Sequence, residues 1–134
     1  MSGPARAGLF VYAKDLERVA GFYAAVAGME RIHGDGSLIV LQSPDIQLLV
    51  HQIPAHIAAE IEITSPPEPR EETALKFFFT VPSLAQARTR ARELGGDVFD
   101  ENWPGSGFIV CNAIDPEGNV FQVREATTCY AVKK

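Results

Sequence analysis

Apolar residues recur along the first half of the chain in the order of a strand, a helix and further strands. Residues 9–13 are apolar and rich in aromatic and β-branched side chains, which predicts a strand. Apolar positions at helical spacing follow from Leu16 to Val26, after Asp15 at the place of an N-cap and before Gly28. Short apolar runs at 38–41 and 46–53 predict two more strands.

The same order recurs after residue 74. Residues 75–81 predict a strand centred on Phe77-Phe78-Phe79, and Ser83 with Gln86 forms an S-x-x-Q capping box for a helix that Gly95-Gly96 ends. Further strands are predicted from residue 97, at 108–111 and at 120–123. Each half is therefore a strand, a helix and about three strands, and neither half could bury its sheet face alone.

Length and composition predict one ordinary globular domain over residues 1–134. The first repeat covers about 7–53, a proline-rich connection covers 54–73, and the second repeat covers about 74–125. A net charge of -5 argues against a nucleic-acid partner, because phosphate contacts need a clustered basic surface. No apolar run approaches the ~18 residues of a membrane span. Cys111 and Cys129 form no C-x-x-C pair, and we expect a cytoplasmic protein.

Specific motifs join this duplication. Asp15-Leu16-Glu17 opens the first helix, Phe22-Tyr23 lies near its end, and Asp115-Pro116-Glu117-Gly118-Asn119 precedes the last predicted strand. With the repeated β-α-β-β-β unit, they resemble the vicinal oxygen chelate superfamily, over about residues 7–125. That superfamily includes glyoxalase I, extradiol dioxygenases, fosfomycin resistance enzymes and bleomycin resistance proteins.

The resemblance implies an α+β fold in which two βαβββ repeats form a cupped, barrel-like mixed sheet with helices outside. It also implies a small-molecule site inside the cup and a homodimer. Metalloenzymes of the superfamily place metal ligands at positions that correspond here to Gly8, Leu49, Lys76 and Gln122.

These four residues make a poor ligand set. Gly8 and Leu49 have no donor atom, Lys76 brings a positive charge, and Gln122 offers one neutral oxygen. Catalytic zinc usually takes three protein ligands. We therefore expect no metal at these positions and no cofactor, while a divalent metal held by other residues stays open.

Strand alternation predicts which side chains face the cup, and these form an aromatic-walled cavity with a few polar groups. Trp103 is predicted on a Gly/Pro-containing loop, either as a lid over the cavity or as an anchor packed on the core. The candidate ligand-binding residues are Phe10, Tyr12, Gln47, Leu49, His51, Lys76, Phe78, Trp103, Gln122 and Arg124.

Lys76 and Gln122 are the candidate catalytic residues. Lys76 could bind an anionic or carbonyl group or act as an amine; alternatively it could snorkel to solvent or pair with Glu125. Two functions stay open. One is a metal-free protein that binds an aromatic or amphipathic small molecule. The other is a lyase, isomerase or dioxygenase of the glyoxalase-like group, with an atypical metal site or with metal-independent chemistry.

Overall fold

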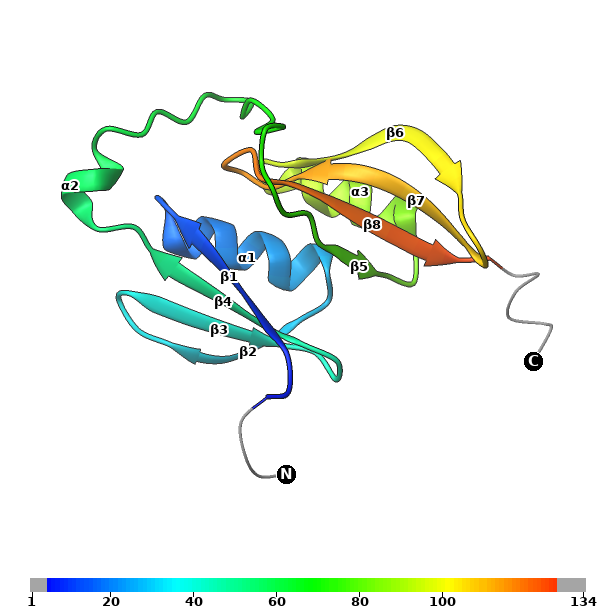
Figure 1. The fold of residues 1–134 in the computed structure, drawn as a ribbon, viewed down its shortest axis with the longest axis horizontal. Helices are drawn as coiled ribbons and strands as arrows, with labels where there is room; N and C mark the ends of the chain where they lie inside the picture. The colour runs from blue at the N-terminus through cyan, green and yellow to red at the C-terminus, as the bar shows by residue number, and fades with distance from the viewer. Residues whose placement is uncertain (1–4, 128–134) are drawn as a thin grey trace.

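The chain folds as two consecutive βαβββ units, as the sequence predicts (Figure 1). The structure is a computed structural model that describes residues 5–127. The first unit contains β1 (Gly8–Ala13), α1 (Leu16–Val26), β2 (Glu30–Gly34), β3 (Leu38–Gln42) and β4 (Gln47–Gln52). The second contains β5 (Phe78–Thr80), α3 (Leu84–Glu93), β6 (Asp97–Pro104), β7 (Phe108–Ile114) and β8 (Val120–Ala126). A short helix, α2 (Ala55–Ala58), lies in the segment that connects them.

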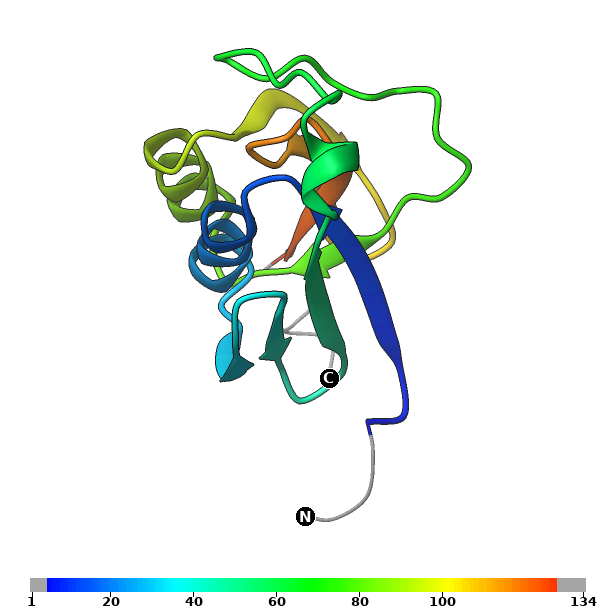
Figure 2. The same ribbon diagram turned by 90° about the vertical axis from the view of Figure 1, so that its left-hand side faces the viewer.

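Each unit forms a four-stranded mixed sheet. The strand orders are β1-β4-β3-β2 and β5-β8-β7-β6, with β1 parallel to β4 and β5 parallel to β8. The remaining neighbours are antiparallel. The sheets are cupped and do not close into a barrel, and α1 and α3 lie next to each other on one side of them (Figure 2). Within residues 5–127, neither α1 nor α3 packs on the opposite faces of the sheets.

Both long helices begin at the residues that the sequence predicts. The side chain of Asp15 accepts a hydrogen bond from the backbone N–H of Arg18 at 3.2 Å. Ser83 accepts one from the N–H of Gln86 at 3.1 Å. Each cap satisfies one of the N–H groups that a helix start leaves without an intrahelical partner.

A cluster of aromatic rings joins the two units. Tyr23 on α1 packs against Phe121 on β8, with ring centroids 5.3 Å apart, and Phe77 stacks on Phe121 at 5.6 Å. Phe22 and Phe79 complete the cluster, and their side chains are buried. Rings on the helix of the first unit thus pack on β8 of the second, so the units share one hydrophobic core.

The turn between β7 and β8 is organised by a buried carboxylate. Asp115 is fully buried and accepts hydrogen bonds from the Tyr23 hydroxyl at 2.7 Å and the Glu117 N–H at 2.8 Å. The backbone and side-chain amides of Asn119 also donate to it, at 3.0 and 2.8 Å. Burial, followed by the charge of Asp115, raises the pKa of Tyr23 well above its ordinary value.

The same turn is tied to the start of α1. The carboxylate of Glu117, which is 4% exposed, accepts the backbone N–H groups of Lys14 and Asp15 at 2.8 and 2.7 Å. Gly118 has a φ of +87° and lies against a backbone carbonyl of Glu68, so a side chain there would clash. The Asp-Pro-Glu-Gly-Asn motif is therefore a structural connector between the two units.

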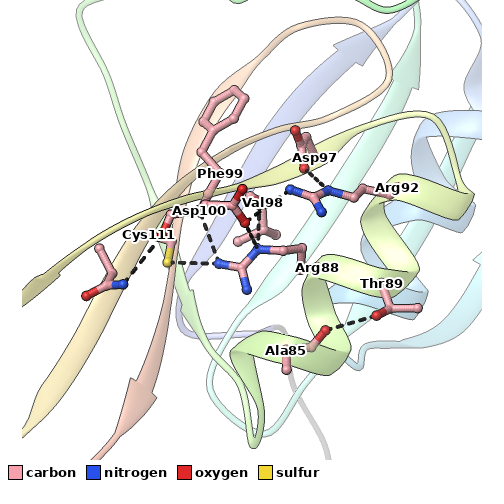
Figure 3. Close-up of polar contacts among 10 residues, drawn as sticks. Ala85, Arg88, Thr89, Arg92, Asp97, Val98, Phe99, Asp100 and Cys111 are labelled. Carbon is pink, nitrogen blue, oxygen red and sulfur yellow. Dashed lines mark hydrogen bonds and ion pairs between the residues drawn. The ribbon is translucent and has the colours of Figure 1, made fainter.

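Polar contacts from Arg88 hold α3 on β6 and β7 (Figure 3). Its guanidinium donates to the carbonyls of Val98 at 2.9 Å and Phe99 at 3.0 Å, and lies 3.3 Å from Asp100. It also donates to the Cys111 thiol at 3.4 Å. Cys111 is 1% exposed, and burial raises the pKa of this thiol despite the guanidinium.

Several predicted details need correction. β5 is limited to Phe78–Thr80 instead of 75–81, and Leu75 is 81% exposed, since only three residues pair with β8. The exposed strand β2 was not located by the hydrophobic pattern, because all its residues are exposed. Cys129 lies outside the described residues. Among residues 5–127, no helix combines the length and the apolar character that a membrane crossing requires.

Candidate functional site

The helix-free face of the first sheet carries half-exposed aromatic rings on its edge strand. Phe10 and Tyr12 on β1 are 53% and 59% exposed, whereas the alternating residues Val11 and Ala13 are buried against the helices. The two rings stack with centroids 6.1 Å apart. This alternation is typical of a strand that has one face in the core and leaves the other open.

The neighbouring strand β4 brings three more of the predicted residues to this face. In the parallel register, Gln47 lies beside Gly8, Leu49 beside Phe10 and His51 beside Tyr12. The rings of Tyr12 and His51 are 5.8 Å apart, and all three β4 side chains are partly buried. Five predicted residues therefore form one continuous patch, which we call the first concave face.

The second sheet has a matching patch on its helix-free side. Phe78 on β5 lies beside Gln122 on β8, and Thr80 lies beside Arg124. Gln122 donates from its side-chain amide to the Asn112 carbonyl oxygen at 3.3 Å. Phe78 is 51% exposed, while its neighbours in the Phe77–Phe79 run face the core, as predicted.

Arg124 lies at the centre of this second patch. Its guanidinium carbon is 3.7 Å from the ring centroid of Phe78 and 4.3 Å from that of Phe108. Such stacking of a cation on aromatic faces is attractive, by about 0.5–2 kcal/mol. We define the second concave face by the residues that the strand register places on it: Phe78, Trp103, Phe108, Asn112, Gln122 and Arg124.

Trp103 belongs to a strand and not to the predicted loop. It lies on β6, paired with Val110 of β7, and is 39% exposed. The loop prediction was wrong because the Pro and Gly residues that suggested it mark the end of a strand. Trp103 is thus a fixed part of the second concave face.

Lys76 precedes β5 and is exposed. With Asn112 and Val120 it lines a hollow of about 380 Å³. Among residues 5–127, Lys76 forms no ion pair, and Glu125 instead accepts the N–H of Leu84 at 2.7 Å. The alternative pairing of Lys76 with Glu125 is therefore not formed.

A hollow of about 280 Å³ joins the two halves. Phe10 and Tyr12 line it from the first unit, and Leu75, Phe77 and Val120 line it from the second. The structure thus brings the predicted residues together as two patches, one on each sheet, with Lys76 at the edge of the second. Sequence reasoning missed Phe108 and Asn112, although strand alternation with Val110 would have placed both on this face.

The positions of the superfamily's metal ligands can be tested against this arrangement. A side chain at Gly8 would lie 3.7 Å from the Leu49 side chain, so these two positions adjoin, but neither residue has a donor atom. Gln122 is hydrogen-bonded to Asn112, and Lys76 is cationic. Among residues 5–127, no three His, Cys, Asp or Glu side chains are grouped as a metal site would require. The donor set at these positions does not fit a divalent metal.

Similarity to known proteins agrees with the fold. The sequence model of the glyoxalase-like domain matches residues 8–124, so the chain belongs to the glyoxalase-like domain family. A search of curated protein sequences found no match.

Solved structures share the fold at low sequence identity. A glyoxalase/bleomycin resistance protein/dioxygenase family enzyme from Burkholderia phytofirmans PsJN has a TM-score of 0.68 at 16% identity, over 92% of this chain and 100% of that one. The fosfomycin resistance protein FosX from Mesorhizobium loti has a TM-score of 0.61 at 16% identity, over 98% and 99%. A lactoylglutathione lyase from Agrobacterium tumefaciens has a TM-score of 0.56 at 24% identity, over 92% and 95%. At such identities, the similarity concerns the fold alone.

Proposed function

We propose that this protein binds a small aromatic or amphipathic molecule on its concave faces, without a metal at the superfamily's ligand positions. The observation that carries the proposal is the exposure of three rings, Phe10, Tyr12 and Phe78, on the open sides of the sheets. Large aromatic residues exposed together on one side of a sheet are uncommon in a domain of this size unless something covers them.

The same rings support a homodimer as part of the proposal. A Phe or Tyr side chain buries about 150–250 Å² when fully covered, so three half-exposed rings leave roughly 300 Å² of apolar surface in water. At about 25 cal/mol per Å², covering it is worth several kcal/mol before the costs of association. A second copy and a bound ligand would share this surface. Our expectations of a cytoplasmic location, and of no nucleic-acid or membrane partner, belong to the same proposal.

The second candidate is a glyoxalase- or dioxygenase-like enzyme that acts on a carbonyl compound. One observation favours it: Lys76 and Asn112 line the same hollow, and Asn112 holds the Gln122 side chain. A cation and two amides could orient a carbonyl group there. Lys76 is exposed, however, and enzymes that use a lysine amine for covalent chemistry usually bury it.

Ligand binding can be tested with Nile red, a neutral and flat probe. We expect saturable binding by the full-length protein, a rise of the unfolding temperature with probe concentration, and a change in Trp103 emission. Phe10→Ala should weaken binding several-fold, whereas Ile57→Ala, which removes an equally exposed apolar side chain from α2, should not. Absence of binding at any protein concentration, or equal effects of both substitutions, would contradict the proposal.

Metal analysis separates the metal-free binding protein from the metal-dependent form of the second candidate. Protein purified without chelators should contain less than stoichiometric zinc, nickel, manganese or iron, and Lys76→Ala should leave Nile red binding in place. Stoichiometric metal, lost from the Gln122→Ala variant, would instead support the metalloenzyme.

A further inference from the structure

The guanidinium of Arg124 differs from those of three other arginines in how it is held. Arg31 pairs with Glu17 at 2.9 Å, Arg88 with Asp100 at 3.3 Å, and Arg92 with Asp97 at 2.7 Å. Arg124 pairs with no carboxylate among residues 5–127, although the chain has 17 acidic residues. Its Nε is buried and has no hydrogen-bond partner in the part of the chain that the structure describes.

An unsatisfied buried donor of this kind costs about 1–3 kcal/mol, so it calls for an explanation. A shortage of acidic residues does not explain why Arg124 lacks a carboxylate partner, because the net charge of the protein is -5. The arginine is instead fixed by rings. Phe78 comes from β5 and Phe108 from β7, the two strands that flank β8, so the rings approach Arg124 from opposite sides.

Rings that pack on a guanidinium limit a ligand to the N–H groups at its edge. Phe78 and Phe108 pack on the group and its Nε is buried, so the donors left for a ligand are the terminal N–H groups, which lie in the guanidinium plane. A carboxylate is planar and accepts two parallel hydrogen bonds in that plane, whereas a tetrahedral phosphate must place oxygens above and below it. The arrangement therefore favours a planar carboxylate.

The neighbouring residues indicate what the carboxylate is attached to. Arg124 on β8 lies beside Val110 on β7, and Val110 lies beside Trp103 on β6. Neighbouring strands are about 4.8 Å apart, so the backbones of Arg124 and Trp103 are separated by roughly 10 Å, with Val110 between them. A fused or substituted aromatic ring spans this distance, with its carboxylate at Arg124 and its far edge against the indole.

We propose that Arg124, fixed between Phe78 and Phe108, is the binding residue for the carboxylate of a flat aromatic acid whose ring extends toward Trp103. This inference rests on the proposed function and names the chemical class of the ligand. It also gives the leading role in anion binding to Arg124 instead of Lys76, because no ion pair within residues 5–127 fixes the orientation of Lys76.

The test compares three probes that share one ring: 2-naphthoate, 2-naphthamide and 2-naphthyl phosphate. Calorimetric titration of the full-length protein should give a Kd for 2-naphthoate at least about tenfold below that of the neutral amide, the usual size of a charge-assisted pair. The phosphate should bind more weakly than the carboxylate. Equal affinity for acid and amide, or tighter binding of the phosphate, would overturn the inference.

Variants test whether Arg124 causes the preference for the acid over the amide. Arg124→Gln should remove the preference for the acid while the Kd for the amide changes less than about twofold, and Arg124→Lys should restore only part of it. Arg90→Gln, which removes an exposed arginine of α3, is the matched control and should behave as the unmodified protein. If Arg124→Gln folds by circular dichroism and keeps the preference, the assignment is wrong.

The comparison of probes on the unmodified protein remains decisive even if Arg124→Gln does not fold. If Nile red and 2-naphthamide bind but the acid has no advantage, this inference fails and the proposed function stands. If none of the four compounds binds, both fail.

Discussion

Tyr23→Phe tests whether the polar connection between the two units stabilises the fold. The substitution keeps the ring, which packs on Phe121 and its neighbours, and removes only the hydroxyl that donates to Asp115 at 2.7 Å. Asp115 then keeps three of its four hydrogen bonds, those from Glu117 and Asn119. A buried hydrogen bond to a charged group contributes about 1.5–3 kcal/mol, and we expect the free energy of unfolding to fall by that amount.

The measurement is equilibrium unfolding in urea, followed by far-UV circular dichroism at two protein concentrations, because a dimer adds a concentration-dependent contribution. Tyr12→Phe is the matched control. It removes the same atom from a ring that is 59% exposed, and should change stability by less than about 0.5 kcal/mol. A loss below about 0.5 kcal/mol for Tyr23→Phe would show that the hydroxyl does not hold the units together.

The pH dependence gives a second check. The pKa of Tyr23 is raised above its ordinary value of 10.0, first by burial and then by Asp115. The folded state therefore keeps the proton that the unfolded state releases, so this contribution is full below pH 10 and declines as the pH rises further. The stability difference between the unmodified protein and Tyr23→Phe should narrow by up to about 1.4 kcal/mol per pH unit above 10. A constant difference up to pH 11 would contradict the assignment.

Three other substitutions have defined outcomes. Gly118→Ala should destabilise the fold by more than about 1 kcal/mol in urea unfolding, because φ is +87° and a backbone carbonyl blocks the side chain; an unchanged midpoint would disprove the clash. In a Cys129→Ser background, Cys111 should react with a thiol reagent at neutral pH only as fast as the protein unfolds, since burial raises the pKa of the thiol. Asp35→Asn should remove an acid-sensitive contribution to stability. Hydrogen bonds led by the Ser37 N–H lower the pKa of Asp35 from 3.8 to about 2, so the contribution is present above pH 4 and disappears toward pH 2. Acid titrations of variant and unmodified protein that run parallel would exclude it.

Much of the fold could be predicted from the sequence, because the helix caps, the hydrophobic spacing and the turn residues indicated the same elements. Asp15 and Ser83 cap the predicted helices, and alternation correctly separated Phe10 and Tyr12 from the buried residues between them. The sequence did not predict the position of β2, because all of its residues are exposed and it has no hydrophobic pattern. Trp103 was misplaced because local Pro and Gly residues outweighed its pairing with a distant strand, which no local signal reports.

The candidate site was likewise predicted only in part from the sequence. Strand alternation predicted that Gln122 and Arg124 share a face, but not that Phe78 and Phe108 hold Arg124 between them. That depends on the strand order β5-β8-β7, which brings together residues far apart in the sequence. Likewise, the sequence identified Lys76 as a candidate, and only its position before β5 shows that it is exposed.

The amino-acid sequence by itself determined the duplicated βαβββ pattern, the helix caps, the turn motif at Asp115 and the absence of donor atoms at Gly8 and Leu49. These depend on residue type and on contacts within a few positions along the chain. The tertiary structure decided that Phe10, Tyr12 and Phe78 are exposed, that Tyr23 joins the two units, and that Arg124 has rings instead of carboxylates as neighbours among the residues the structure describes. Such contacts form between distant strands, where packing and the order of the sheet select the partners.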